Sequence, residues 1–143
     1  MCVVGAGASG LCATREALRR GFDVRAYERS DSVGGVWAYG HASGKVFNNV
    51  IQNVTKMCGV FADYPAPERA PPYLGWEQTM EYLTGYCTFF NLEERIEFNA
   101  EVVRVGRQTG VPTPLNANLV ELVYEAERAG RGSPGLTAWD MRP

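Results

Sequence analysis

The 143-residue sequence predicts an α/β fold, a parallel sheet flanked by helices. Residues 1–4, MCVV, form an apolar run that is typical of a short buried strand. Apolar side chains between Ser9 and Arg20 fall on one stripe of a helix, and the following residues FDVRAYE alternate as a second strand that ends near Glu28. A strand, a helix and a strand in this order indicate a right-handed parallel crossover, which brings both strand ends to one edge of the sheet.

The glycine cluster GAGASG matches G-x-G-x-x-G at Gly5, Gly7 and Gly10, between the predicted strand and helix as the motif requires. Gly5 permits the turn, Gly7 lets a pyrophosphate approach the backbone, and Gly10 lets the helix pack closely. We expect the pyrophosphate at the helix N-terminus, where Ser9 also lies. Glu28 is placed to accept hydrogen bonds from ribose hydroxyls, and its charge disfavours a 2′-phosphate. The motif predicts FAD or NAD binding, against the competing interpretation of a glycine-rich surface turn.

The rest of the chain is predicted to hold a long loop, one helix and two strands. Residues 30–75 are rich in Gly and Pro but carry aromatic side chains, which indicates an ordered excursion over a ligand. WEQTMEYLTGYCTFFNLEER has helical periodicity, RIEFNAEVVRV alternates as a half-buried strand, and LVELVYEAE is interpreted as a further strand.

Composition favours a soluble cytoplasmic protein. The net charge of −2 gives no electrostatic signature of nucleic-acid binding, and we find neither a membrane-spanning apolar run nor a signal peptide. Four cysteines without a C-x-x-C pair and a single histidine, His41, in a polar loop predict reduced thiols and no metal site.

Several segments resemble the flavin-containing monooxygenases. YERSDSVGGVW is similar to that family's FE(R/K)S–xx–GG–xW stretch, VFNNVIQNVTK to its strand and turn before a Ser-Lys pair, and FADYPAPE to its FxDFPFPxD segment. The similarity continues through MEYLTGYCTFFNLEERIEFNAEVVRV, covering residues 1–105, and more loosely through LVELVYEAERAG. It implies an FAD-type Rossmann domain in which Gly34 and Gly35 extend the FAD-binding surface towards the flavin.

The resemblance also implies roles for single residues. Asn53 corresponds to an active-site asparagine near the reactive face of the flavin, with an ordinary turn asparagine as the alternative. Lys56 corresponds to a family lysine, with a solvated surface lysine as the alternative. Trp37 would flank the flavin unless it only packs in the core, and Val102 would lie on a strand whose backbone contacts adenine. Val54 departs from the family, which has Ser or Thr after the asparagine.

The function implied by the resemblance is that of the FAD-binding N-terminal part of an NADPH-dependent monooxygenase of the N,N-dimethylaniline type. Such enzymes use O₂ and a C4a-hydroperoxyflavin to oxygenate small molecules at a soft nitrogen or sulfur. The alternatives are an inactive truncated FAD-binding fragment and another FAD-dependent oxidoreductase, such as an amine oxidase. The sequence lacks the redox cysteine pair that a disulfide reductase needs. A plain NAD-binding module would not account for the motifs that follow Glu28.

We predict that residues 1–130 form the N-terminal part of the FAD-binding domain and that residues 131–143 form an atypical tail. The family requires a second G-x-G-x-x-G unit for NADPH and later strands of the FAD domain, and neither occurs in this sequence. The Rossmann domain is therefore expected to be incomplete, truncated before the NADPH domain. An unpaired sheet edge leads us to expect marginal stability and weak retention of FAD.

Overall fold

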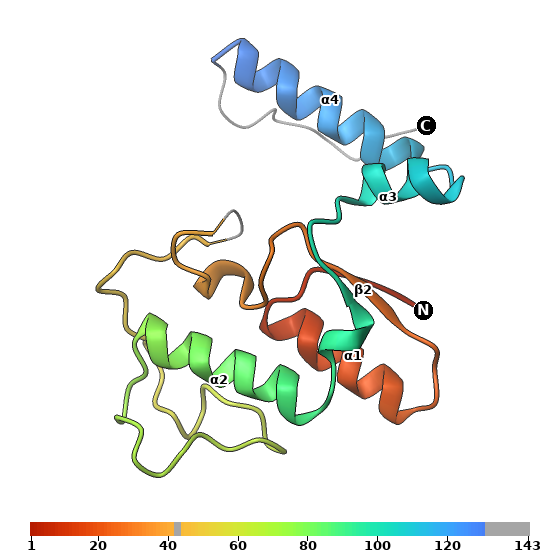
Figure 1. Ribbon diagram of the computed structural model, residues 1–143. Helices are drawn as coiled ribbons and strands as arrows, with labels where there is room; N and C mark the ends of the chain where they lie inside the picture. The colour runs from red at the N-terminus through yellow and green to blue at the C-terminus, as the bar shows by residue number, and fades with distance from the viewer. Residues whose placement is uncertain (42–43, 131–143) are drawn as a thin grey trace. The chain divides into compact units, whose positions relative to one another are not determined.

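The computed structural model describes residues 1–41 and 44–130, so the predicted tail at 131–143 lies outside the described residues (Figure 1). The chain divides into two compact units, Met1–Ala100 and Glu101–Pro143. The first contains β1 (Cys2–Val4), α1 (Ala8–Arg19), β2 (Arg25–Tyr27), the 3₁₀ turn η1 (Gly35–Trp37), α2 (Trp76–Phe89), the 3₁₀ turn η2 (Glu93–Arg95) and β3 (Ile96–Glu97). The second contains α3 (Val102–Thr109) and α4 (Pro114–Arg128).

The three strands form one parallel sheet in the order β1-β2-β3. Val3 is paired with Ala26, and Ala26 with Ile96, so β2 is central. The strand–helix–strand unit predicted from the sequence is confirmed. The prediction of a buried strand at residues 1–4 holds only for Val3, because β1 is an edge strand whose Cys2 and Val4 are exposed.

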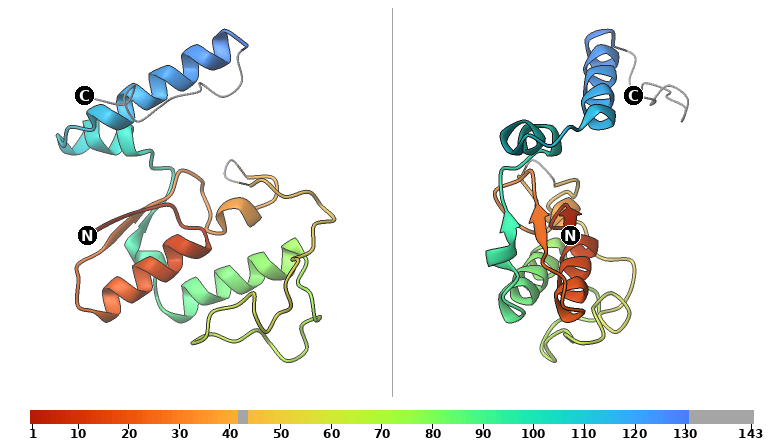
Figure 2. Two further views of the ribbon diagram at one scale, coloured as in Figure 1. Left: turned by 180° about the vertical axis from the view of Figure 1, so that it is seen from behind. Right: turned by 90° about the vertical axis from the view of Figure 1, so that its right-hand side faces the viewer.

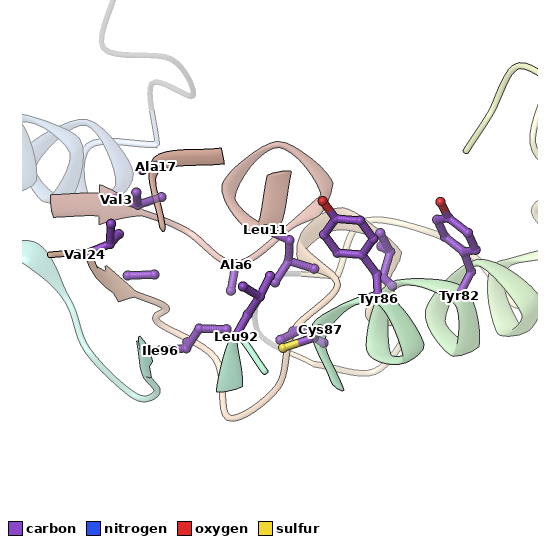
Figure 3. Packing of buried hydrophobic residues seen from close by; sticks show 13 residues of the cluster. Val3, Ala6, Leu11, Ala17, Val24, Tyr82, Tyr86, Cys87, Leu92 and Ile96 are labelled. Carbon is purple, nitrogen blue, oxygen red and sulfur yellow. The ribbon is translucent and has the colours of Figure 1, made fainter. Parts of the chain in front are cut away.

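The core of the first unit lies between the sheet, α1 and α2. Figure 3 shows its apolar side chains converging from these elements into one cluster. Leu11 and Val24 are completely buried, and Tyr86 and Leu92 are 1% exposed. Burial of each such side chain contributes about 1.5–3 kcal/mol. The helix predicted at residues 9–20 is present as Ala8–Arg19, and the one predicted at 76–95 is present as the shorter Trp76–Phe89, because their apolar faces have this cluster to cover.

The described part of the long excursion between β2 and α2 is ordered. Both views in Figure 2 show it running alongside α2 as irregular chain. Phe61 and Tyr64 anchor it, since their rings pack against that of Tyr86, tilted and edge-on, at centroid distances of 4.4 and 5.7 Å. The hydroxyl of Tyr82 donates a hydrogen bond to the carbonyl oxygen of Tyr64 (2.6 Å) and accepts one from the N–H of Phe61 (2.7 Å). The prediction that aromatic residues order this segment is confirmed.

The two strands predicted after α2 are largely wrong. In RIEFNAEVVRV only Ile96–Glu97 is a strand. Asn99 adopts a left-handed φ of 56°, which ends the extended run, and Val102 is the first residue of α3. The prediction that Val102 lies on a strand is therefore wrong, and the argument that linked its backbone to adenine depended on that strand.

The segment LVELVYEAE belongs to helix α4 rather than to a strand. Pro114 opens this helix at its first position, where its missing N–H costs nothing. Leu115, Leu119 and Leu122 recur at intervals of four and three, which is a helical period. The short run LVELV fits a strand pattern and is also part of this longer helical pattern. The segment adopts the structure that the longer pattern favours, which is a helix.

No helix in the described parts of the chain is both long and apolar enough to cross a membrane. Those residues also contain no group of three or more His, Cys, Asp or Glu side chains able to hold a metal ion. The cytoplasmic location predicted from composition stays a prediction.

Burial of Cys87 predicts that one of the four thiols reacts far more slowly than the others. Cys87 is 3% exposed, whereas Cys2, Cys12 and Cys58 are exposed. Burial raises the pKa of the Cys87 thiol to about 11, so little of the reactive thiolate forms near neutral pH. With Ellman's reagent at pH 8, we expect three thiols to react at once and the fourth only in denaturant. Immediate reaction of all four in the native protein would contradict this packing.

Candidate functional site

The glycine loop between β1 and α1 turns where the predicted motif requires it. Gly5 has a φ of +91°, a conformation that glycine adopts without strain, and its N–H donates a hydrogen bond to the carbonyl oxygen of Tyr27 (2.8 Å). Gly7 then caps α1, and its carbonyl oxygen accepts the first helical hydrogen bond from Leu11 (2.9 Å). The loop therefore joins the ends of β1 and β2 at one edge of the sheet.

Gly10 lets the first turn of α1 lie directly on this loop. A Cβ atom at Gly10 would come within 1.9 Å of the carbonyl oxygen of Gly5. The contact is between backbone atoms, so no side-chain rotation can relieve it. The predicted structural role of the third glycine, close packing of the helix, is confirmed.

The second glycine cluster packs on the first. The N–H of Gly34 donates a hydrogen bond to the carbonyl oxygen of Ala6 (3.0 Å). A Cβ atom at Gly35 would lie 2.9 Å from the Cα of Gly7, and Gly35 has a left-handed φ of +56°. Contact between the two loops thus requires glycine at position 35, whether or not a ligand is bound. Only the three-dimensional structure reveals this requirement, because the two clusters are far apart in the sequence.

Glu28 connects the same loops through its carboxylate. The side chain follows β2 and the residue is 3% exposed. Its Oε2 accepts a hydrogen bond from the N–H of Ala6 (2.7 Å), and its Oε1 accepts one from the N–H of Ser30 (2.8 Å). The position beside the glycine loop agrees with the sequence prediction, but this structural role was not predicted. A carboxylate has about four acceptor positions, so these two bonds do not by themselves exclude a hydrogen bond from a ribose hydroxyl.

The N-terminus of α1 is suited to an anion. No side chain caps it and its first turn holds no acidic residue, whereas α2 begins with Glu77 and a bond from the N–H of Gly75 to the Gln78 side chain (2.9 Å). The first-turn N–H groups of α1 and the positive end of its dipole therefore have no side-chain partner at the cap. Exposed Ser9 lies in this turn. These features fit a diphosphate.

The remaining predicted residues lie outside the glycine loops. Trp37 ends η1, is partly buried and packs against the core cluster, which accounts for it without a ligand. Asn53 is exposed in the excursion. Lys56 is partly buried, and its ammonium group donates hydrogen bonds to three backbone carbonyl oxygens. Val102 belongs to the second unit.

The structure thus brings together the three glycines of the first loop, the two of the second, and Glu28. A parallel strand–helix–strand unit with this edge defines a dinucleotide-binding α/β domain. The sequence matches the flavin-binding monooxygenase-like family over residues 1–124. The chain belongs to this family, whose cofactors are FAD and NADPH.

Individual relatives agree with this assignment. The chain is 36% identical over 111 residues to rat flavin-containing monooxygenase 3, covering 73% of this chain and 20% of that protein. It is 36% identical over 109 residues to human flavin-containing monooxygenase 1, covering 72% and 20%. The chain spans about a fifth of the length of these curated relatives.

Solved structures show the same fold. S-allyl-L-cysteine S-oxygenase from Allium sativum superposes with a TM-score of 0.66 at 25% identity, over 71% of this chain and 28% of that one. A steroid monooxygenase bound to NADP gives a TM-score of 0.61 at 26% identity, over 68% of this chain and 18% of that one.

We predict that Gly10→Ala destabilises the protein even though alanine favours helices. The added methyl group meets a backbone oxygen, and overpacking of this kind costs about 1–3 kcal/mol, against a helix-propensity gain of about 1 kcal/mol. The difference is about 0–2 kcal/mol, and because a backbone oxygen cannot move aside we expect the free energy of unfolding in urea to fall by an amount near the upper end of this range, about 2 kcal/mol. Ser9→Ala, one residue earlier and exposed, is the control and should change it by less than about 0.5 kcal/mol. A stabilised Gly10→Ala variant would be incompatible with the described contact.

Glu28→Gln should also destabilise the protein without any ligand. The amide keeps one acceptor oxygen, so the N–H of either Ala6 or Ser30 loses its bond, at a cost of about 1–3 kcal/mol. Glu97→Gln is the matched control, because Glu97 is exposed on the neighbouring strand. Equal unfolding free energies for the two variants would show that the Glu28 carboxylate has no structural role.

Proposed function

We propose that this chain is the FAD-binding N-terminal part of an NADPH-dependent flavin-containing monooxygenase acting on soft nitrogen or sulfur nucleophiles. The observation that carries the proposal is the uncapped N-terminus of α1 beside the buried carboxylate of Glu28. An anion-binding helix end and an acceptor for ribose hydroxyls are the two groups that an adenine dinucleotide needs at this edge.

In this proposal the two glycine loops bind different parts of FAD. Gly5, Gly7, Ser9 and Gly10 would hold the diphosphate through backbone N–H groups, and Glu28 would bind the adenosine ribose. The loop of Gly34 and Gly35 lies against Gly7, where it would continue the surface towards the flavin half, with Trp37 at its end. Asn53 would face the reactive side of the flavin, as the family resemblance implies.

Bound FAD would supply the redox chemistry, which is transfer of electrons from NADPH to O₂ so that one oxygen atom would be added to the nucleophile and the other released as water. The family and the S-oxygenase among the similar structures support a soft nucleophile as substrate. Because the chain spans about a fifth of its relatives' length, oxygenation is proposed for a whole protein of this kind and FAD binding for this chain.

Ser9→Asp should strengthen the fold and weaken FAD binding at the same time. A negative charge in the first turn interacts favourably with the helix dipole, by about 0.3–1 kcal/mol, and it repels a diphosphate at the same place. We expect the unfolding free energy of the free protein to stay equal or rise. The FAD dissociation constant, measured by flavin fluorescence titration, should increase about tenfold or more, equivalent to about 1.4 kcal/mol.

Ser9→Asn, of the same size but neutral, is the control for FAD affinity. Riboflavin, which lacks the diphosphate, is the control ligand and should not distinguish the three proteins. Equal FAD affinity in the Ser9→Asp variant and the wild type would place the diphosphate elsewhere. Failure of the wild type to bind FAD would remove the proposed function of this chain.

A further inference from the structure

Lys56 ties two parts of the excursion together. Its Nζ donates hydrogen bonds to the carbonyl oxygens of Pro67 (3.3 Å), Glu68 (2.7 Å) and Ala70 (2.7 Å). Its backbone N–H donates to the carbonyl oxygen of Pro72 (2.7 Å). All three donors of the ammonium group are therefore used within one short stretch, residues 66–72, which we call the proline segment.

The composition of the proline segment explains why it needs a lysine. Three of its seven residues are prolines, which have no N–H, so the segment has more carbonyl acceptors than donors of its own. Only the N–H of Ala70 serves a carbonyl within it, that of Pro67 (2.9 Å). A compact ammonium with three rotatable donors suits converging carbonyl oxygens, whereas the planar guanidinium of arginine does not.

A second anchor lies just before Asn53. The backbone N–H of Gln52 donates to the carbonyl oxygen of Leu74 (2.8 Å). The Gln52 side chain donates to Thr79 Oγ1 (3.0 Å), whose hydroxyl donates to the carbonyl oxygen of Gly75 (2.8 Å). The loop of residues 52–56 is thus fixed at one end to the start of α2 and at the other to the proline segment.

Asn53 lies between these anchors with its side chain exposed. Within the described residues its amide makes no hydrogen bond or ion pair. The backbone of the loop is held, while the Asn53 side chain, which has a predicted role towards the flavin, is left exposed. A loop that is fixed in this way presents a polar group in one orientation before any ligand arrives.

We propose that Lys56 is a positioning residue: its ammonium group locks the Asn53 loop to the proline segment and so fixes where the Asn53 amide is presented. The role of Asn53 towards the flavin rests on the proposed function, whereas the locking of the loop does not. Lys56 itself is not placed in contact with the cofactor.

Hydrogen exchange tests the locking without FAD. The full chain is compared as wild type, Lys56→Met, Lys56→Arg and Lys45→Met, with peptide-level mass spectrometry after pepsin digestion. We expect at least tenfold faster exchange in peptides covering residues 52–59 and 66–72 for both Lys56 variants. Lys45 is the matched control, because it is the other lysine and its exposed side chain makes no bond in the described structure. Peptides from α1 and the strands report whether each variant is folded.

Unchanged exchange at residues 52–59 in a folded Lys56 variant would overturn the inference, even if the proline segment loosens. Full protection in Lys56→Arg would show that any cation suffices and would overturn the argument from ammonium geometry. If Lys56→Met does not fold, Lys56→Gln, which keeps two donors without the charge, replaces it in the same comparison.

Flavin spectroscopy separates positioning from a merely structural role. FAD is titrated into the wild type, Asn53→Ala, Lys56→Met and the double variant. The fluorescence emission of the bound flavin is then compared between these four proteins. We expect dissociation constants within about threefold of the wild type, a changed flavin emission in both single variants, and no further change in the double variant. Additive spectral changes would mean that Lys56 does not act through Asn53. A wild type that binds no FAD would count against the proposed function alone, and hydrogen exchange would still decide the role of Lys56.

Discussion

The candidate site depends on the hydrogen bonds that the buried carboxylate of Glu28 accepts from the backbone. A charged group with an exposure of 3% loses most of its hydration, and hydrogen bonds from two backbone N–H groups replace it. One of those groups belongs to Ala6 in the glycine loop and the other to Ser30 after β2. The backbone of Glu28 also bonds the chain around β3, through Glu97 (2.9 Å) and Ala100 (2.8 Å). A single residue therefore holds together the three strand ends at the edge where the ligand is proposed to bind.

The two glycine loops are built around the same requirement, which is close approach of backbone to backbone. Gly10 lies on Gly5, and Gly35 lies on Gly7, each within distances that exclude a Cβ atom. Loops fixed by such contacts keep their N–H groups in place without a ligand. An adenine dinucleotide would then meet a prepared surface, which reduces the ordering that binding has to impose.

The described part of the excursion between β2 and α2 is ordered by a different means. It has little regular structure, and several of its backbone groups find partners in side chains: Tyr82 serves the backbone of Phe61 and Tyr64, and Lys56 serves the proline segment. This arrangement lets a segment rich in proline and glycine stay in place beside α2. It also leaves Asn53 exposed on a loop with two fixed ends.

The sequence alone was enough to predict the strand–helix–strand unit, a helix that begins at residue 76 and the family, because local periodicity and closely spaced motifs carry those features. It also located the glycine loops and Glu28 at one edge of a parallel sheet. It misassigned Val102 and the segment LVELVYEAE, since a few alternating residues satisfy a strand pattern while a left-handed Asn99 and the longer helical period decide otherwise. Only the tertiary structure revealed the packing of Gly35 on Gly7, the bond of Glu28 to Ala6 and the three carbonyl partners of Lys56. Each joins residues separated by 11 or more positions in the chain, and the residue types in a sequence do not specify which distant backbone groups will meet.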